Sequence, residues 1–212
     1  MSKWEKAGMK SKKIIGLTGS IATGKSTAAR IIRDLGYQVI DADKVAHELM
    51  EKDELNYNAI VGSFGGQILD GTGNIDRLLL GNIVFSDIDK LNLLNTLTHH
   101  NIFRKIEDII ENSKENIIFI ELPILFELKL RGELSLPIEE SWLIYVNYEK
   151  QLDRLIRRNN LTIEQAKDRI DSQMDIEKKR ELADVIIYND GDISHLEDQI
   201  KKRLDKKDES CC

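Results

Sequence analysis

Residues 13–27 read KIIGLTGSIATGKST, an apolar run that leads through a glycine-rich turn into a helix-forming segment. The first part, residues 13–18, has the composition of a short buried strand. A turn over residues 19–24 follows, and a helix is expected over residues 25–35, where Gly36 ends it. A strand, a glycine turn and a helix in this order indicate an α/β fold built on a parallel sheet.

The turn fits the phosphate-binding pattern G-x-x-x-x-G-K-[ST] and stands between a predicted strand and a predicted helix, as that motif requires. Its glycines let backbone N–H groups converge on phosphate oxygens, and the helix N-terminus adds positive potential. Lys25 would contact the β- and γ-phosphates, and the Ser26 hydroxyl would hold the Mg²⁺ that accompanies ATP. The expected ATP-binding residues of this loop are Gly19, Ser20, Ile21, Ala22, Thr23, Gly24, Lys25, Ser26 and Thr27.

The composition describes a globular protein and excludes several classes. The 212 residues include 37 acidic and 31 basic ones, and the net charge of -6 argues against a protein that coats nucleic acid. The longest apolar stretch, residues 117–126, is too short for a membrane helix of ~18 residues. The two cysteines, Cys211 and Cys212, provide no disulfide framework. We therefore expect a cytoplasmic monomer or weak homo-oligomer without nucleic-acid or membrane partners.

The rest of the chain alternates strands with helices around a long helical segment. Further strands are expected at residues 38–40, 117–122, 142–146 and 185–188. Between them, residues 53–116 show apolar residues at helical spacing and predict a helical insertion. Later helices are expected at residues 149–158, at 162–182 and from the last strand to about residue 206.

Charged residues follow several of the predicted strands. Asp41 and Asp43 end the second strand, where an open α/β sheet places its ligand crevice. Either carboxylate could accept a proton or hold Mg²⁺ through water, or it could only cap the following helix. Glu121, near the end of the third strand, and Glu127, after it, are candidates for a metal-organising acid and equally for residues without such a role.

Three arginines, Arg154, Arg157 and Arg158, cluster on one predicted helix. Guanidinium groups suit the oxygens of a transferring phosphoryl group, and such an arginine can contribute roughly 10³–10⁵ in rate. The alternative is a solvated helix face whose charge is balanced by Glu149 and Asp153.

Motifs along most of the chain resemble the dephospho-coenzyme A kinase family in order and spacing, from Ile14 to about Ile200. The matching segments are the loop itself, VIDAD at 39–43, Phe64-Gly65, Ile75-Asp76-Arg77, Leu80, Val84-Phe85, LPILFE at 122–127, Gln151, Arg154, Leu155, Arg158, Arg169-Ile170, Gln173, Ala183-Asp184, Asn189 and Gly191. The expected fold is a three-layer P-loop NTPase sandwich with a five-stranded parallel sheet. The nucleotide-binding core would span 13–52 and 117–206, with a lid at about 149–182.

The resemblance implies that ATP phosphorylates the ribose 3′-hydroxyl of dephospho-coenzyme A. Catalytic roles would fall to Asp43, Lys25 and Arg154, and Arg158 and Asn189 would join the ATP site. The helical insertion, residues 53–116, would hold the substrate. The residues that bind the substrate would be Asp43, Arg77, His99, Pro123 and Leu125.

The chain also departs from the family pattern. His99-His100 stands where the family usually has His-Pro, so the placement of His99 is open, and a helix-surface histidine is the alternative. Ser20 and Ala22 replace two usual glycines. Two rival functions remain: another small-molecule or nucleoside-monophosphate kinase, and a regulatory nucleotide-binding ATPase. The paired aspartates and the insertion favour an enzyme with a phosphoryl acceptor.

Overall fold

The computed structural model describes residues 12–208, so Cys211 and Cys212 lie outside it. The chain divides into two compact units: a first unit up to Ile40 and from Lys114 onward, and a second unit from Asp41 to Ser113. Helix α2 (Ala42–Glu48), expected in the nucleotide-binding core, belongs to the second unit because it contacts α5 (Ile88–Asn112).

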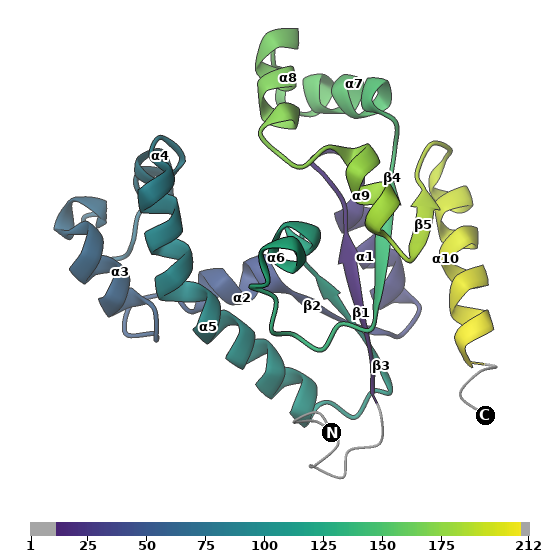
Figure 1. Cartoon of the computed structure of the whole chain (residues 1–212), viewed down its shortest axis with the longest axis horizontal. Coiled ribbons are helices and arrows are strands. Elements are labelled where there is room, and N and C mark those ends of the chain that lie inside the picture. Colours follow the sequence, from purple (N-terminus) through teal and green to yellow (C-terminus); the bar gives the residue numbers. More distant parts are fainter. Residues whose placement is uncertain (1–11, 209–212) are drawn as a thin grey trace. The chain divides into compact units, whose positions relative to one another are not determined.

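The first unit is built on a five-stranded sheet in the order β2-β3-β1-β4-β5 (Figure 1). The strands are β1 (Lys13–Thr18), β2 (Gln38–Asp41), β3 (Ile117–Glu121), β4 (Glu140–Tyr145) and β5 (Val185–Tyr188). The pairs β1–β3, β1–β4 and β4–β5 are parallel. The five predicted strands are thus confirmed within a residue or two at each end, and β1 lies at the centre.

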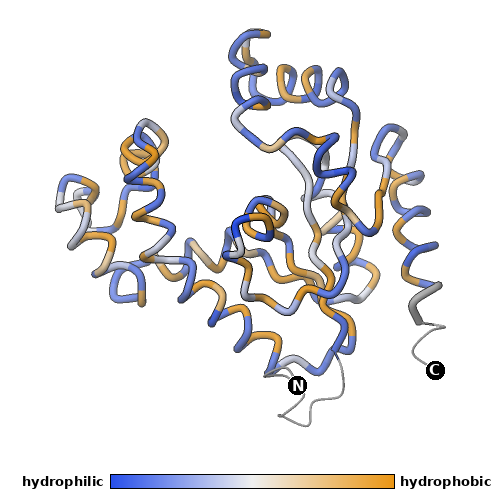
Figure 2. Tube along the Cα trace, viewed as in Figure 1, coloured by the Kyte–Doolittle hydropathy of each residue, from blue (hydrophilic) through white to orange (hydrophobic). Residues whose placement is uncertain are grey.

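Helices cover both faces of this sheet. They are α1 (Lys25–Asp34), α6 (Leu125–Arg131), α9 (Ile176–Leu182) and α10 (Ile193–Asp208). Helices α7 (Tyr148–Asn159) and α8 (Ile163–Asp171) instead pack against each other, beyond the ends of the strands (Figure 1). Alternate residues of β4 face opposite sides: Trp142 shares a cluster with α1 and α10, and Leu143 packs with Ile176 of α9. Along α10, apolar and polar positions alternate, as expected for a helix with one buried face (Figure 2).

The segment expected as one helix over 162–182 is two helices, which corrects the prediction. Helix α8 begins at a capping box in which Thr162 and Gln165 bond each other's backbone N–H groups. It ends at Asp171, and the Asp175 side chain caps the start of α9 by accepting from the Glu177 N–H at 2.7 Å. The apolar periodicity continues across the break, which explains why it predicted a continuous helix.

The second unit is helical and has its own core. Besides α2 and α5 it contains α3 (Tyr57–Phe64), the short 3₁₀ helix η2 (Gly66–Ile68) and α4 (Arg77–Phe85). The buried cluster consists of Ile60, Phe64, Ile68, Ile75, Leu80 and Val84. Between residues 12 and 208, no helix is both long enough and apolar enough to cross a membrane.

Candidate active site

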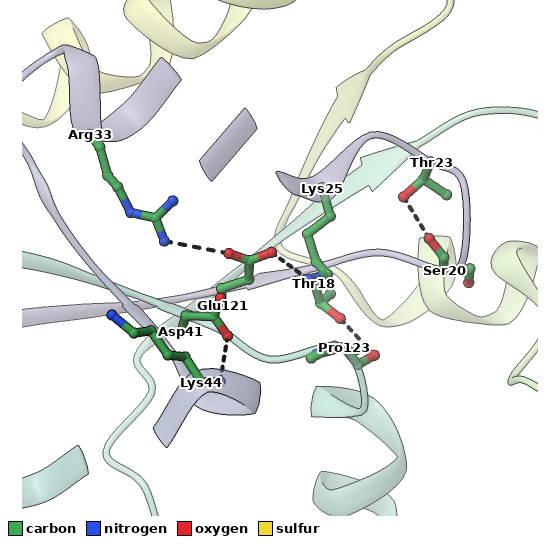
Figure 3. Close-up of polar contacts among 9 residues, drawn as sticks. All are labelled: Thr18, Ser20, Thr23, Lys25, Arg33, Asp41, Lys44, Glu121 and Pro123. Carbon is green, nitrogen blue, oxygen red and sulfur yellow. Dashed lines mark hydrogen bonds and ion pairs between the residues drawn. The ribbon is translucent and has the colours of Figure 1, made fainter. Parts of the chain in front are cut away.

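The phosphate-binding loop joins the central strand β1 to α1 and adopts a bent backbone. Gly24 has φ +90° and stands at the N-cap of α1. Ala22 also lies in the left-handed region, with φ 61°, which is uncommon for a residue with a side chain. The Thr23 hydroxyl donates to the Ser20 carbonyl oxygen at 2.9 Å and closes the turn (Figure 3). The loop is therefore shaped by its own contacts as well as by its glycines.

Two of the predicted site residues meet at this loop. The side-chain amide of Asn189, just after β5, donates to the Thr23 carbonyl oxygen at 2.8 Å. The Arg154 guanidinium, on α7, donates to the backbone oxygen of Asn189 at 2.8 Å. Asn189 and Arg154 thus form one chain of contacts onto the phosphate-binding loop.

The other two arginines of α7 have different surroundings. Arg158 is exposed and donates to the Asn159 side chain at 2.9 Å. Arg157 forms an exposed ion pair with Asp153 at 2.9 Å, as the solvated-face alternative predicted. Exposed pairs of this kind contribute little to stability. Of the three arginines, Arg154 is the one bonded to the loop's supporting residues.

A buried carboxylate lies beside the loop lysine. The Lys25 ammonium contacts Glu121 Oε1 at 2.5 Å, and the Arg33 guanidinium lies 3.6 Å from Glu121 Oε2 (Figure 3). The Glu121 side chain is 6% exposed. Two cations therefore surround a carboxylate at the end of β3, and the phosphates of a bound nucleotide would compete with it for Lys25.

The same place offers ligands that suit Mg²⁺. Mg²⁺ prefers hard oxygen donors and keeps several waters, so it needs few protein ligands. Ser26 presents an exposed hydroxyl in the first turn of α1, directly after Lys25. Glu121, paired with Lys25, supplies a carboxylate. These donors fit the ion: Ser26 would be a direct ligand, and Glu121 would be the acid near it.

The segment after β3 is held by a lysine that sequence patterns did not single out. Lys179, on α9, is 1% exposed; its ammonium contacts Glu127 at 2.8 Å and donates to the Pro123 carbonyl oxygen at 2.9 Å. The Thr18 hydroxyl donates to the same oxygen at 3.2 Å. Leu125, expected to bind substrate, is 1% exposed and belongs to the buried core of this structure.

A hollow of about 400 Å³ lies beside the loop, between α7 and the segment joining α8 to α9. It is lined by Ser20, Tyr148, Gln151, Ile170, Asp171, Gln173, Met174, Asp175, Ile176 and Glu177. Its volume is within the ~300–1,000 Å³ range of small-molecule sites. Partial desolvation and the nearby Asp171 carboxylate raise the pKa of Tyr148.

The second unit carries the remaining candidates. Asp41 is the N-cap of α2 and accepts from the Lys44 N–H at 3.0 Å, whereas Asp43 is exposed in the first turn. The capping role that was open for both aspartates therefore belongs to Asp41. Arg77 is exposed at the start of α4, after its Asp76 cap.

His99 lies within the continuous helix α5, half-buried, with its ring centroid 5.6 Å from that of Phe103. With His100 in place of proline, no helix start is imposed at this point, and α5 runs through both histidines. The ring contact fixes the position of His99 within the second unit.

Gly24 provides a test of the loop geometry. A Cβ at this position would overlap Asn189 Nδ2, and φ +90° is unfavourable for any residue with a Cβ. We expect Gly24→Ala to lower the free energy of unfolding by about 2–3 kcal/mol, from backbone strain plus a lost hydrogen bond, and to weaken ATP binding. Denaturant unfolding and calorimetric ATP titration measure both effects.

Gly62 is the matched control. It lies exposed inside α3, and a Cβ there would meet nothing within 4 Å. Gly62→Ala should stabilise the protein by about 0.5–1 kcal/mol, because alanine favours helices. Equal effects of the two substitutions would contradict the loop geometry.

A family model described as dephospho-CoA kinase matches residues 13–195. The chain belongs to the dephospho-CoA kinase family. The dephospho-CoA kinase of Carboxydothermus hydrogenoformans is 42% identical over 196 residues, which are 91% of this chain and 93% of that relative. The family membership agrees with the resemblance inferred from the motifs.

Solved structures show the same relationship. The dephospho-CoA kinase from Campylobacter jejuni has a TM-score of 0.68 at 32% identity and covers 95% of this chain and 100% of that one. A crystal structure of the Thermus thermophilus protein TT1252 has a TM-score of 0.78 at 30% identity, with 93% and 98% coverage. The fold is thus that of a P-loop kinase.

The sequence did not reveal that three further residues contribute to the site. These residues are Gln151, Gln173 and Lys179. Gln151 and Gln173 were matched to the family's helix motif without a role, and both bond the backbone of the phosphate-binding loop. The available signal was a polar residue at a buried helix position: Gln151 is 0% exposed on the otherwise amphipathic α7. Lys179 offers the same signal on α9.

Proposed function

We propose that this chain transfers the γ-phosphoryl group of ATP to the ribose 3′-hydroxyl of dephospho-coenzyme A, giving coenzyme A and ADP. One observation carries the proposal: in a dephospho-CoA kinase family member, the phosphate-binding loop is bonded to Asn189, which Arg154 holds in turn. This arrangement places a cationic side chain next to the loop that grips the phosphates, as phosphoryl transfer requires.

The loop and its neighbours divide the work of binding ATP. Backbone N–H groups of the loop and of the start of α1 hold the phosphates, apart from those that are bonded within the protein, such as the N–H groups of Ile21 and Thr23. Lys25 moves from Glu121 toward the phosphate oxygens. Arg154 neutralises charge that develops during transfer, and Arg158 and Asn189 complete the nucleotide site. Ser26 would hold Mg²⁺, which would help to neutralise the charge of the phosphates.

The second unit, Asp41–Ser113, would hold the acceptor. Asp43, whose carboxylate is exposed, accepts the proton of the attacking hydroxyl. Arg77 and His99 are proposed to contact the substrate. Pro123, which is half-buried, is a further proposed substrate residue. The partners of this enzyme are therefore two anionic small molecules, gripped by local positive groups on a chain of net charge -6.

The direct test is an acceptor panel. The full chain is incubated with ATP and Mg²⁺ and with dephospho-coenzyme A, adenylate, guanylate or shikimate, and ADP and phosphorylated product are quantified. We expect product with dephospho-coenzyme A alone. Transfer to one of the other acceptors instead would favour a different small-molecule kinase, and ATP hydrolysis without any acceptor product would favour a regulatory ATPase.

A further inference from the structure

One residue of the phosphate-binding loop has both backbone polar groups bonded to glutamine side chains. The Ile21 N–H donates to Gln173 Oε1 at 2.8 Å, and Gln151 Nε2 donates to the Ile21 carbonyl oxygen at 2.8 Å. Gln151 is on α7, and Gln173 is in the segment between α8 and α9. Two separate elements, more than 120 residues away in sequence, therefore hold a single loop residue.

Apolar contacts reinforce this attachment. The side chains of Ile21 and Ala22 pack against a cluster formed by α7 and α8, whose buried members are Leu155, Ala166 and Ile170. The middle of the loop is thus seated in the small core of these two helices. The backbone and the side chain of Ile21 are therefore both in contact with the α7–α8 part of the chain.

The two hydrogen bonds fix the peptide planes on either side of Ile21. In a trans peptide, the C=O and the following N–H point in opposite directions. Because Gln173 takes the Ile21 N–H, the Ser20 carbonyl oxygen points back into the loop, where it accepts from Thr23 N at 3.3 Å and Oγ1 at 2.9 Å. Because Gln151 takes the Ile21 oxygen, the Ala22 N–H points away from α7.

The placement of Gln151 supports a specific role. Its side chain is 0% exposed, and its Oε1 has no hydrogen-bond partner among the residues that the structure describes. An unpaired buried acceptor is unfavourable, and an apolar side chain of similar length would avoid it. The amide of Gln151 nevertheless makes one hydrogen bond that an apolar side chain could not make, from Nε2 to the Ile21 carbonyl oxygen.

We propose that Gln151 and Gln173 are positioning residues that hold the phosphate-binding loop in its ATP-binding conformation. They orient the peptide groups around Ile21 and thereby keep the Ala22 amide directed away from α7 and free for phosphate oxygens. Without these two glutamines the loop populates other conformations. The apparent ATP affinity then falls in proportion to the population of the binding conformation. This inference rests on the proposed function only in taking ATP as the ligand.

The two hydrogen bonds run in opposite directions, so the same substitution should have different effects at Gln151 and at Gln173. A backbone N–H can only donate and a carbonyl oxygen can only accept, so Gln173 must present its oxygen and Gln151 its NH₂ group. Glutamate keeps an acceptor and loses the donor. Gln173→Glu therefore retains its bond, whereas Gln151→Glu loses it and faces a carboxylate toward a carbonyl oxygen.

The experiment measures the Kd for ATP and, separately, for dephospho-coenzyme A by calorimetry, with the melting temperature of each variant. Gln151→Met and Gln173→Met should each raise the ATP Kd about tenfold and leave the Kd for dephospho-coenzyme A unchanged. Gln173→Glu should restore ATP affinity to within about threefold of the unaltered chain, and Gln151→Glu should not. Gln165→Met, which removes the α8 capping box without touching the loop, is the matched control and should bind ATP normally.

Unchanged ATP affinity in both methionine variants would overturn the inference, as would equal behaviour of the two glutamate variants. Gln173 is exposed, so its variants fold even where a buried Gln151→Glu does not. An unaltered chain that binds ATP without phosphorylating dephospho-coenzyme A would contradict the proposed function alone. The two failures are therefore distinguishable.

Discussion

Asp43→Asn is expected to lower kcat by about 10²–10⁴-fold, the usual contribution of a positioned general base, while the Kd for ATP stays nearly unchanged. Asparagine has almost the same shape as aspartate but cannot take up the hydroxyl proton. The fold should persist because Asp41, not Asp43, caps α2, and Asp43 is exposed. Initial rates with saturating ATP and dephospho-coenzyme A, and calorimetry with ATP alone, give the two quantities.

Helix α5 offers a matched control for this substitution. There Asp87 is the N-cap and Asp89 is the exposed first-turn acid, the same two-residue pattern as Asp41 and Asp43. Asp89→Asn should leave kcat within a factor of about two, because it changes only a helix-dipole interaction. A comparable loss of turnover in both variants, or lost ATP binding in folded Asp43→Asn, would contradict the assigned role.

Lys179→Met is expected to lower the free energy of unfolding by about 3–5 kcal/mol, the cost of breaking a buried ion pair from one side. The ammonium is 1% exposed and serves both Glu127 and the Pro123 oxygen. The Glu127 Oε2 atom already has no hydrogen-bond partner among the described residues, so loss of Lys179 leaves its whole carboxylate uncompensated. Denaturant unfolding at neutral pH measures the change.

Two further variants test whether burial of the ion pair causes the loss of stability in Lys179→Met. Lys201 also pairs with a glutamate, Glu197, at 2.6 Å, but both side chains are more than a third exposed. Lys201→Met should change stability by less than about 1 kcal/mol, because exposed pairs are screened by solvent. The double variant Lys179→Met with Glu127→Leu should recover most of the loss, since it removes both buried charges. Equal effects of Lys179→Met and Lys201→Met would show that burial of the pair is unimportant.

The elements of the first unit could be predicted because their signals are local. The apolar run of β1, the glycines of the loop and Gly36, with φ +92°, lie within a few residues of the structures they produce. The loop residues and Lys25 were identified for the same reason. The break between α8 and α9 was missed because a side-chain cap at Asp175 overrides an apolar period that continues past it.

The partners of the site residues could not be predicted in this way. Asn189 bonds Thr23 across 166 residues, Gln173 bonds Ile21 across 152, and Lys25 bonds Glu121 across 96. Each of these contacts joins a side chain to a group that lies near it only in the folded chain. Two of the three involve backbone groups, which every residue has. Nothing in the sequence pattern distinguishes one backbone oxygen from another.

The sequence alone therefore determined the strand, the phosphate-binding loop, the helix after it and, through motifs in order, the family. These depend on backbone conformation and side-chain periodicity, which neighbouring residues set. The Asp41 cap of α2 is also a local contact, to the Lys44 N–H three residues along the chain, although the pattern left two aspartates as candidates. Only the tertiary structure decided that Leu125 is buried in the core and that two glutamines bond Ile21. Those roles depend on which groups the parallel sheet and its covering helices bring within hydrogen-bonding distance, and short-range physics does not encode that choice.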